Sequence, residues 1–120
     1  MVGSTGTFTS FAGKYLRNVR DAGVIADGGT LTINFATDAI VRCEWGNGFT
    51  VEYSNYTAGS VVKLLAYKTT GTGTDNMSLD GITAGQVSSG STTVSGTAGL
   101  TTFVEFTCTG TTLGSVYAKV

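Results

Sequence analysis

Four carboxylates are the side chains of this sequence that could act as catalytic acids or bases: Glu44, Glu52, Asp75 and Asp80. Histidine is absent, which excludes Ser-His-Asp and Cys-His catalysis and histidine–zinc sites. Glu44 and Glu52 could approach each other on the outer face of a hairpin, as a glycosidase pair requires. In the strand register given below, however, Glu52 faces Arg42, and we expect a solvated ion pair. The sequence therefore predicts that the protein is not an enzyme.

The segment "GTGTDNMSLDG" contains oxygen ligands of the kind that calcium prefers, in Asp75, Asn76 and Asp80. Their spacing does not match an EF-hand loop, and the segment lacks the lysine of a phosphate-binding loop. We therefore expect a solvated loop, with no metal site and no cofactor.

Aromatic residues gather around a second glycine-containing turn. Trp45 and Phe49 flank "GNG", and Tyr53 and Tyr56 follow. Together with Asn47, these rings could contact a glycan or fill a pocket of a partner. Because they recur on one apolar strand face, a position in the hydrophobic core is the favoured interpretation. Basic residues do not alternate with the rings, as they would in a surface that stacks nucleic-acid bases.

Composition narrows the classes of partner. The 120 residues include seven basic and eight acidic side chains, so the net charge is −1. No overall field attracts nucleic acid or an anionic membrane. No apolar run approaches the ~20 residues of a membrane-spanning helix. We expect neither a nucleic-acid nor a membrane partner.

The elements that would position these residues are strands. Glycine and threonine are abundant, proline is absent, and short alternating apolar runs recur between turns, a pattern typical of all-β domains. We predict a single antiparallel β-sandwich, jelly-roll-like, with an N-terminal arm or short helix. Strands are expected at 30–35, with Leu31, Ile33 and Phe35 on one face, in a hairpin within 39–53, and around 77–79. The run 60–68 is nearly continuous in apolar residues, so we expect a central strand covered on both faces. The last two runs, between 103 and 120, predict a closing hairpin in which Val116, Ala118 and Val120 share the buried face.

The stretch "AIVRCEWGNGFTVEY" predicts a hairpin with a three-residue loop at 46–48. This register keeps apolar residues on one face, whereas a slip of one residue would mix apolar and polar residues on both. It places Gly48 in a bulge, Arg42 opposite Glu52, and three apolar pairs across the strands: Trp45 with Phe49, Cys43 with Val51, and Val41 with Tyr53. Cys43 and Cys108 both lie in strand patterns, where we expect free thiols packed as small apolar groups. A disulfide between them is the alternative.

The first 27 residues follow a different period. Phe8, Phe11, Tyr15 and Val19 recur at helical spacing, and Gly23 could end a helix. We predict an arm or short helix at 1–27 and the sandwich at 28–120. The segment could cover one end of the sandwich, dock against another subunit or shell, or be disordered.

Residues 28–120, above all "GGTLTINFATDAIVRCEWGNGFTVEYSNYTAGSVVKLLAYK" and "TFVEFTCTGTTLGSVYAKV", resemble the small β-sandwich modules of tailed-phage virions. These modules include head decoration (cement) proteins and the tips of fibres and spikes. The resemblance implies a structural protein that forms a homotrimer and acts by binding. A fibre tip normally follows a coiled-coil stem, and no heptads precede the predicted sandwich. We therefore expect a decoration protein on the capsid surface of the virion, bound to the major capsid protein.

The alternative function is a receptor-binding tip that recognises a host surface glycan. Candidate residues for each role can be named. We expect capsid docking through Phe8, Phe11, Tyr15, Arg17 and Arg20, trimer packing through Lys63, Tyr67 and Tyr117, and, in the alternative function, glycan contact through Trp45, Asn47, Phe49, Tyr53 and Tyr56.

Overall fold

The computed structural model describes residues 19–70 and 75–120. In these residues the chain forms nine strands and two short 3₁₀ helices, with no α-helix, so the all-β class is confirmed. The strands are β1 (Val19–Ile25), β2 (Thr30–Asn34), β3 (Ile40–Trp45), β4 (Phe49–Ser54), β5 (Ser60–Lys68), β6 (Asn76–Leu79), β7 (Thr93–Ser95), β8 (Thr101–Cys108) and β9 (Val116–Lys119). The 3₁₀ helices are η1 (Ala84–Gln86) and η2 (Leu113–Ser115).

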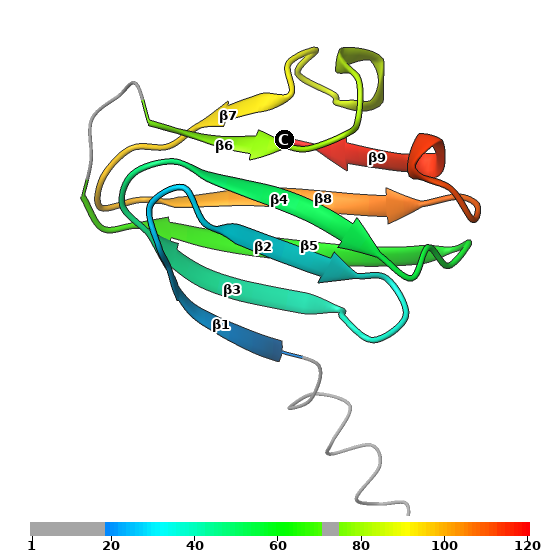
Figure 1. Ribbon diagram of the computed structural model, residues 1–120, viewed down its shortest axis with the longest axis horizontal. Coiled ribbons are helices and arrows are strands. Elements are labelled where there is room, and N and C mark those ends of the chain that lie inside the picture. Colours follow the sequence, from blue (N-terminus) through cyan, green and yellow to red (C-terminus); the bar gives the residue numbers. More distant parts are fainter. Residues whose placement is uncertain (1–18, 71–74) are drawn as a thin grey trace, which may run out of the picture.

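The strands form two sheets, ordered β1-β3-β5-β8-β9 and β2-β4-β6-β7. The first six strands alternate between the sheets along the chain, as the colours in Figure 1 show. Strand β7 then stays beside β6, and β8 and β9 return to the five-stranded sheet.

Both sheets are mixed, so the prediction of an antiparallel arrangement was wrong. All pairs among the first six strands are parallel: β1 with β3, β3 with β5, β2 with β4, and β4 with β6. The pairs β5–β8, β6–β7 and β8–β9 are antiparallel. Parallel neighbours need a crossover connection. Here the crossover is a strand of the opposite sheet.

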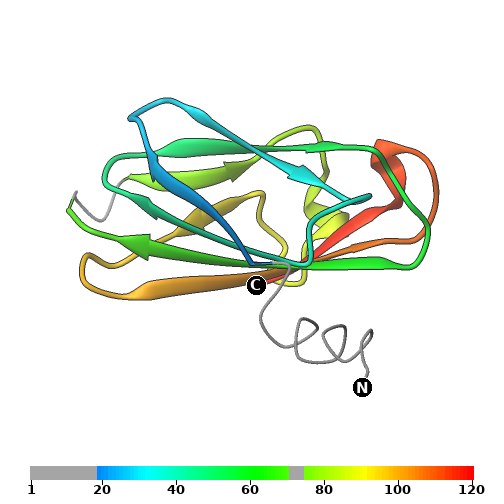
Figure 2. The same cartoon turned by 90° about the horizontal axis from the view of Figure 1, so that it is seen from below.

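One hydrophobic core lies between the buried faces of the two sheets, which Figure 2 shows as two layers. The apolar side chains of both sheets are removed from water there, which is the main favourable term in folding. Ring contacts cross the core, for example Tyr53 of β4 against Phe106 of β8, with centroids 5.5 Å apart. Leu31, Ile33 and Phe35 are buried on one face, as the sequence predicted.

The connection between β3 and β4 is an arch and not the predicted hairpin. The two strands belong to different sheets, and their pairing partners are β1, β5, β2 and β6. Trp45 and Phe49 do meet, with ring centroids 5.3 Å apart at 65°, but across the core and not as neighbours in one sheet. Gly48 is absent from the described residues with positive φ, so it does not supply a left-handed bulge residue.

The N-terminal boundary also differs from the prediction. Val19–Ile25 is strand β1, paired with β3, so the sheet begins before residue 28. Gly23, expected to end a helix, has φ 70° and lies where the β1–β3 register shifts. Glycine adopts this left-handed conformation at little cost, which suits a bulge. The predicted helix residues Phe8, Phe11, Tyr15 and Arg17 lie outside the described residues.

The closing hairpin is confirmed. Strands β8 and β9 pair with Phe106 opposite Ala118 and Cys108 opposite Val116, all four buried. Val120 follows the end of β9 and is exposed, contrary to the expectation that it would share the buried face. Cys43 and Cys108 are free and buried, as the favoured interpretation predicted.

Candidate binding face

The outer face of the five-stranded sheet carries large exposed apolar side chains. Every second residue of β5 from Val62 to Lys68 is buried, so the residues between them point away from the core. The same alternation in β8 and β9 directs Phe103 and Tyr117 outward. The exposed fractions of Tyr67, Phe103 and Tyr117 are 39%, 49% and 44%. Strand β5 was predicted to be covered on both faces, but the core covers only one.

The outer face of the four-stranded sheet has a different composition. Its outward positions are occupied by Thr30 and Thr32 of β2, Thr50 and Glu52 of β4, and Thr93 of β7. Such a polar surface is typical of an antiparallel or mixed sheet with one face in water. The contrast makes the apolar outer face of the five-stranded sheet the candidate binding face.

A charged row crosses the middle of the apolar outer face. We define this charged row as Lys63 of β5, Glu105 of β8 and Lys119 of β9, which are successive cross-strand partners. On β3, the partner of Lys63 is the uncharged Ile40. Cross-strand neighbours of this kind have Cβ atoms about 5 Å apart. Within residues 19–70 and 75–120, no ion pair of 4.0 Å or less joins these charged groups to one another. The row therefore carries charges that remain available to another molecule.

On one side of the charged row lies an apolar patch, which we define as Leu65, Tyr67, Leu100 and Phe103. Leu65 is paired with Phe103 across β5 and β8. Leu100 is 61% exposed, and its carbonyl accepts a hydrogen bond from the Lys68 amide, which holds it beside the end of β5. The sequence analysis selected Tyr67 but missed the other three members of the patch.

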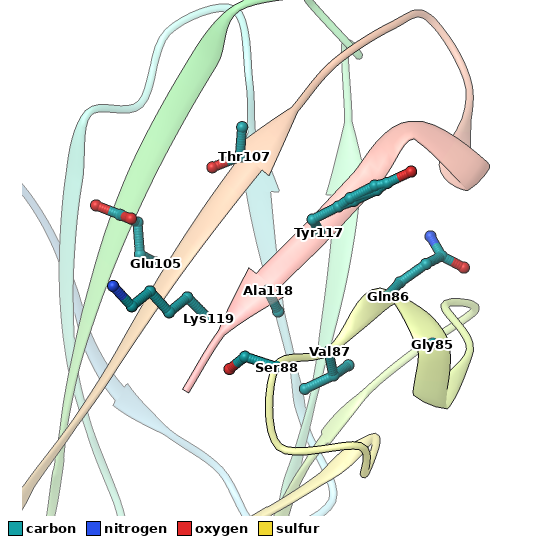
Figure 3. A pocket seen from close by; sticks show the side chains of 9 residues that line it. All are labelled: Gly85, Gln86, Val87, Ser88, Glu105, Thr107, Tyr117, Ala118 and Lys119. Atoms are coloured by element: carbon teal, nitrogen blue, oxygen red, sulfur yellow. The ribbon is translucent and has the colours of Figure 1, made fainter.

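On the other side of the charged row is a cavity of about 410 Å³. Its floor is the outer surface of β8 and β9, and its wall is the segment 85–88, as Figure 3 shows. Val87 forms a parallel bridge with Ala118, which attaches this wall to the edge of the sheet. Tyr117 and Thr107, opposite each other in the β8–β9 register, both line the cavity.

Two arginines near β1 are engaged within the chain. The Arg20 guanidinium forms two hydrogen bonds to Asp38, at 2.9 and 2.8 Å, and one to the Thr32 carbonyl at 2.7 Å. Arg42 pairs with Asp21 at 2.8 Å. Arg20 was expected to dock against a capsid, but its donors are used to join β1 to the four-stranded sheet.

The residues expected to contact a glycan do not form a surface site. Trp45 is 0% and Phe49 2% exposed, so both belong to the core. Asn47 donates from its side chain to Asp27 at 2.7 Å. Tyr53 and Tyr56 are partly buried and pack against Phe35, with ring centroids 6.1 and 6.4 Å away. Core packing, the favoured interpretation, is therefore correct for the rings, and the glycan-contact prediction was wrong for Trp45 and Phe49.

The four candidate catalytic carboxylates do not gather in one site, although two of them, Glu52 and Asp80, lie at the same small cavity. Glu44 points outward from the five-stranded sheet and Glu52 from the four-stranded sheet, so the expected approach of the two, and the pairing of Glu52 with Arg42, were wrong. Glu52 and Asp80 share a small cavity of about 140 Å³ with Tyr53. Burial and the nearby Asp80 carboxylate raise the pKa of the Tyr53 hydroxyl.

We also searched the described residues for a metal site and for a membrane-spanning helix. Within the described ranges, no three His, Cys, Asp or Glu residues are grouped so that they could hold a metal ion. In the same residues no helix is long and apolar enough to cross a membrane.

Lys63, Tyr67 and Tyr117, the residues predicted for trimer packing, all lie on the apolar outer face, although Tyr117 is at the cavity. Their shared position follows from alternation along β5 and β9, which the sequence shows. Glu105 and Lys119 were missed because the sequence does not reveal which strands are neighbours.

Comparison of the chain with protein-family models, curated proteins and solved structures yields no match.

Proposed function

We propose that this chain is a structural protein of a phage virion, a decoration protein that binds the outer capsid shell and stabilises the junctions between capsid subunits. The observation that carries the proposal is the contrast between the two outer faces. One is Thr-rich and polar, and the other has exposed Tyr67, Leu100 and Phe103. Such an asymmetry suits a module that is held on one side and faces water on the other.

The outer face of the five-stranded sheet sets the scale of the contact. Its strands have 7, 6, 9, 8 and 4 residues, and at ~4.8 Å between strands and ~3.4 Å per residue they span roughly 550 Å². This area is smaller than the ~800 Å² that a standard interface buries on each partner, so we expect a small contact in each copy. We interpret the two layers as a β-sandwich that forms a homotrimer, with the apolar patch of each subunit against a neighbour.

In the proposed mechanism the trimer attaches to the major capsid protein at several points. The remaining residues predicted for docking, Phe8, Phe11, Tyr15 and Arg17, precede β1. A trimer would present three such segments, and linked contacts bind far more tightly than one contact alone. Rupture of the shell would then have to break contacts on more than one capsid subunit.

The test is the mass in solution by sedimentation equilibrium, followed by co-sedimentation with shells of the major capsid protein encoded in the same genome. We expect a trimer for the full chain, a trimer for a chain lacking residues 1–18, and a monomer for Phe103→Asp. Only the full chain should co-sediment strongly. Thr50→Asp, on the polar outer face, is the matched control and should remain trimeric. A wild-type monomer, or a trimer that ignores capsid shells, would refute the proposal.

A further inference from the structure

The cavity beside β9 has the size and rigidity of a ligand site. Its volume of about 410 Å³ falls within the ~300–1,000 Å³ typical of small-molecule pockets. The wall at 85–88 is fixed to the sheet: the Ser88 amide donates to the Ala118 carbonyl at 2.9 Å, and the Gln86 amide group donates to the Val116 carbonyl at 2.8 Å. The Ser88 hydroxyl accepts from the Val120 amide at 2.8 Å. A ligand would therefore meet a largely preformed site.

The polar groups of Gln86 and Ser88 are used in holding the wall, but three others are not. The Glu105 carboxylate, the Lys119 ammonium and the Thr107 hydroxyl have no side-chain hydrogen-bond or ion-pair partner among the described residues. All three line the cavity. They offer an acceptor, a donor, and a group that can act as either.

An aromatic ring completes the lining. Tyr117 also lines the cavity and leaves 44% of its surface exposed, and in Figure 3 its ring lies on the same side as Gln86. Tyrosine provides a rigid apolar surface with a polar tip. The cavity thus combines one ring with hydrogen-bonding groups on one side.

We propose that this cavity binds an uncharged saccharide. A sugar ring presents C–H groups on one face, which suit the Tyr117 ring, and hydroxyl groups at its edge, which both donate and accept hydrogen bonds. Glu105 can accept from two neighbouring hydroxyls, and bonds to charged groups are the stronger kind. Glu105 and Lys119 cancel in charge, so an anionic or cationic ligand would meet one group of its own sign.

The site is separate from the surface used in the proposed function. Thr107 lies four residues beyond Phe103 on β8, or about 14 Å at ~3.4 Å per residue. Glu105 and Lys119 of the charged row border the cavity on the side that faces the patch. A partner on the apolar patch would leave the cavity open, and this inference does not depend on trimer formation. It assigns to Tyr117 a role in ligand binding in place of the trimer packing expected from the sequence.

The test is an array of neutral hexose and N-acetylhexosamine oligosaccharides, with sialylated and sulfated glycans alongside, probed with the full chain. We expect binding to one or more neutral glycans. Tyr117→Ala should weaken that binding about tenfold or more, the usual effect of removing an aromatic anchor. Glu105→Gln should weaken it as well. Phe103→Asp should lose the trimer and retain, per subunit in solution, the affinity for the glycan.

Circular dichroism and thermal unfolding establish that each variant is folded. If Tyr117→Ala does not fold, Glu105→Gln decides, because its side chain lies outside the core. The inference is overturned if no neutral glycan binds, if only charged glycans bind, or if both folded variants bind like the wild type. None of these results would alter the mass measured for the proposed trimer.

Discussion

At the scale of single residues, the clearest electrostatic contact is that of Asp38 with Arg20. Burial alone would raise the pKa of Asp38, but hydrogen bonds from Arg20 and from the Asn34 amide, together with the charge of Arg20, outweigh burial and lower this pKa below its ordinary value. A carboxyl group whose pKa is lower in the folded state stabilises the fold above its unfolded pKa of about 3.9. That stabilisation disappears as the pH falls through the folded pKa.

We therefore expect the free energy of unfolding to fall on acidification below about pH 4, and Asp38→Asn to lose part of this pH dependence. At pH 7 the substitution should cost about 1 kcal/mol, the range of a hydrogen-bonded pair near the surface. Urea unfolding measured from pH 7 to pH 2.5 checks both effects. Parallel pH curves for the wild type and Asp38→Asn would show that another carboxyl group is responsible.

Lys68 shows which features of a residue the sequence predicts and which it does not. The alternation of β5 places Lys68 on the buried face with Val62 and Leu64, and Lys68 is indeed 0% exposed. Sequence analysis attended to Lys63 and missed Lys68, because an isolated buried charge is costly. The cost is offset by the Trp45 ring, whose centroid is 4.7 Å from the ammonium, and by the Asp75 and Gly96 carbonyls at 3.3 Å. No pattern in the sequence indicates those three partners.

At the scale of elements, strand positions were predictable and strand partners were not. The predicted run 60–68 matches β5, because alternation, β-branched residues and a flanking turn mark a strand locally. The pairing of β3 with β4 was wrong because a hairpin and an arch require the same alternation. In a hairpin the apolar side chains of both strands share one sheet face. In the arch they point at each other from two sheets, as Trp45 and Phe49 do.

Paired cysteine substitutions distinguish the arch from the hairpin. Thr32 is the partner of Glu52 in the β2–β4 register, and both point outward. We expect Thr32→Cys with Glu52→Cys to form a disulfide under mild oxidation, since neighbouring strands bring Cα atoms within the ~7 Å limit. Arg42→Cys with Glu52→Cys, opposed in the rejected hairpin, should stay reduced.

Mass spectrometry of the alkylated and digested protein reads the result. The native thiols should not interfere, because both are buried and burial raises the pKa of Cys43 to about 11. A bridge between positions 42 and 52 as frequent as that between 32 and 52 would contradict the sheet order.

At the scale of the whole molecule, the topology brings distant segments together. The parallel pairs join residues such as Thr30 with Thr50 and Ile40 with Lys63, and such non-local pairing slows folding to milliseconds or seconds. Proline is absent, so the isomerisation phase of about 10–100 s should be absent too. Stopped-flow refolding of Phe103→Asp, by tryptophan fluorescence, checks this without the complication of assembly. A phase of a minute in that variant would be incompatible with the expectation.

The whole-molecule function was the least accessible from the sequence. Composition and the missing histidine led us to predict a binding protein. The shared outer face, however, depends on the strand order β3-β5-β8-β9, which joins strands that are far apart in the chain. Local patterns specify which residues of each strand point outward. They do not specify which outward residues become neighbours.

The alternation of the first six strands between the two sheets also divides this part of the chain into similar structural units. One strand from each sheet makes a complete turn of a coil, and equivalent positions such as Leu31 and Val51 recur after about 20 residues, within the range of solenoid repeats. Strands β7 to β9, which pair antiparallel with β6, with β5 and with each other, close this coil as a cap would. A version with one more turn inserted between β4 and β5 would keep the same cap and widen both faces by one strand, so a longer relative could arise by duplication without a new fold.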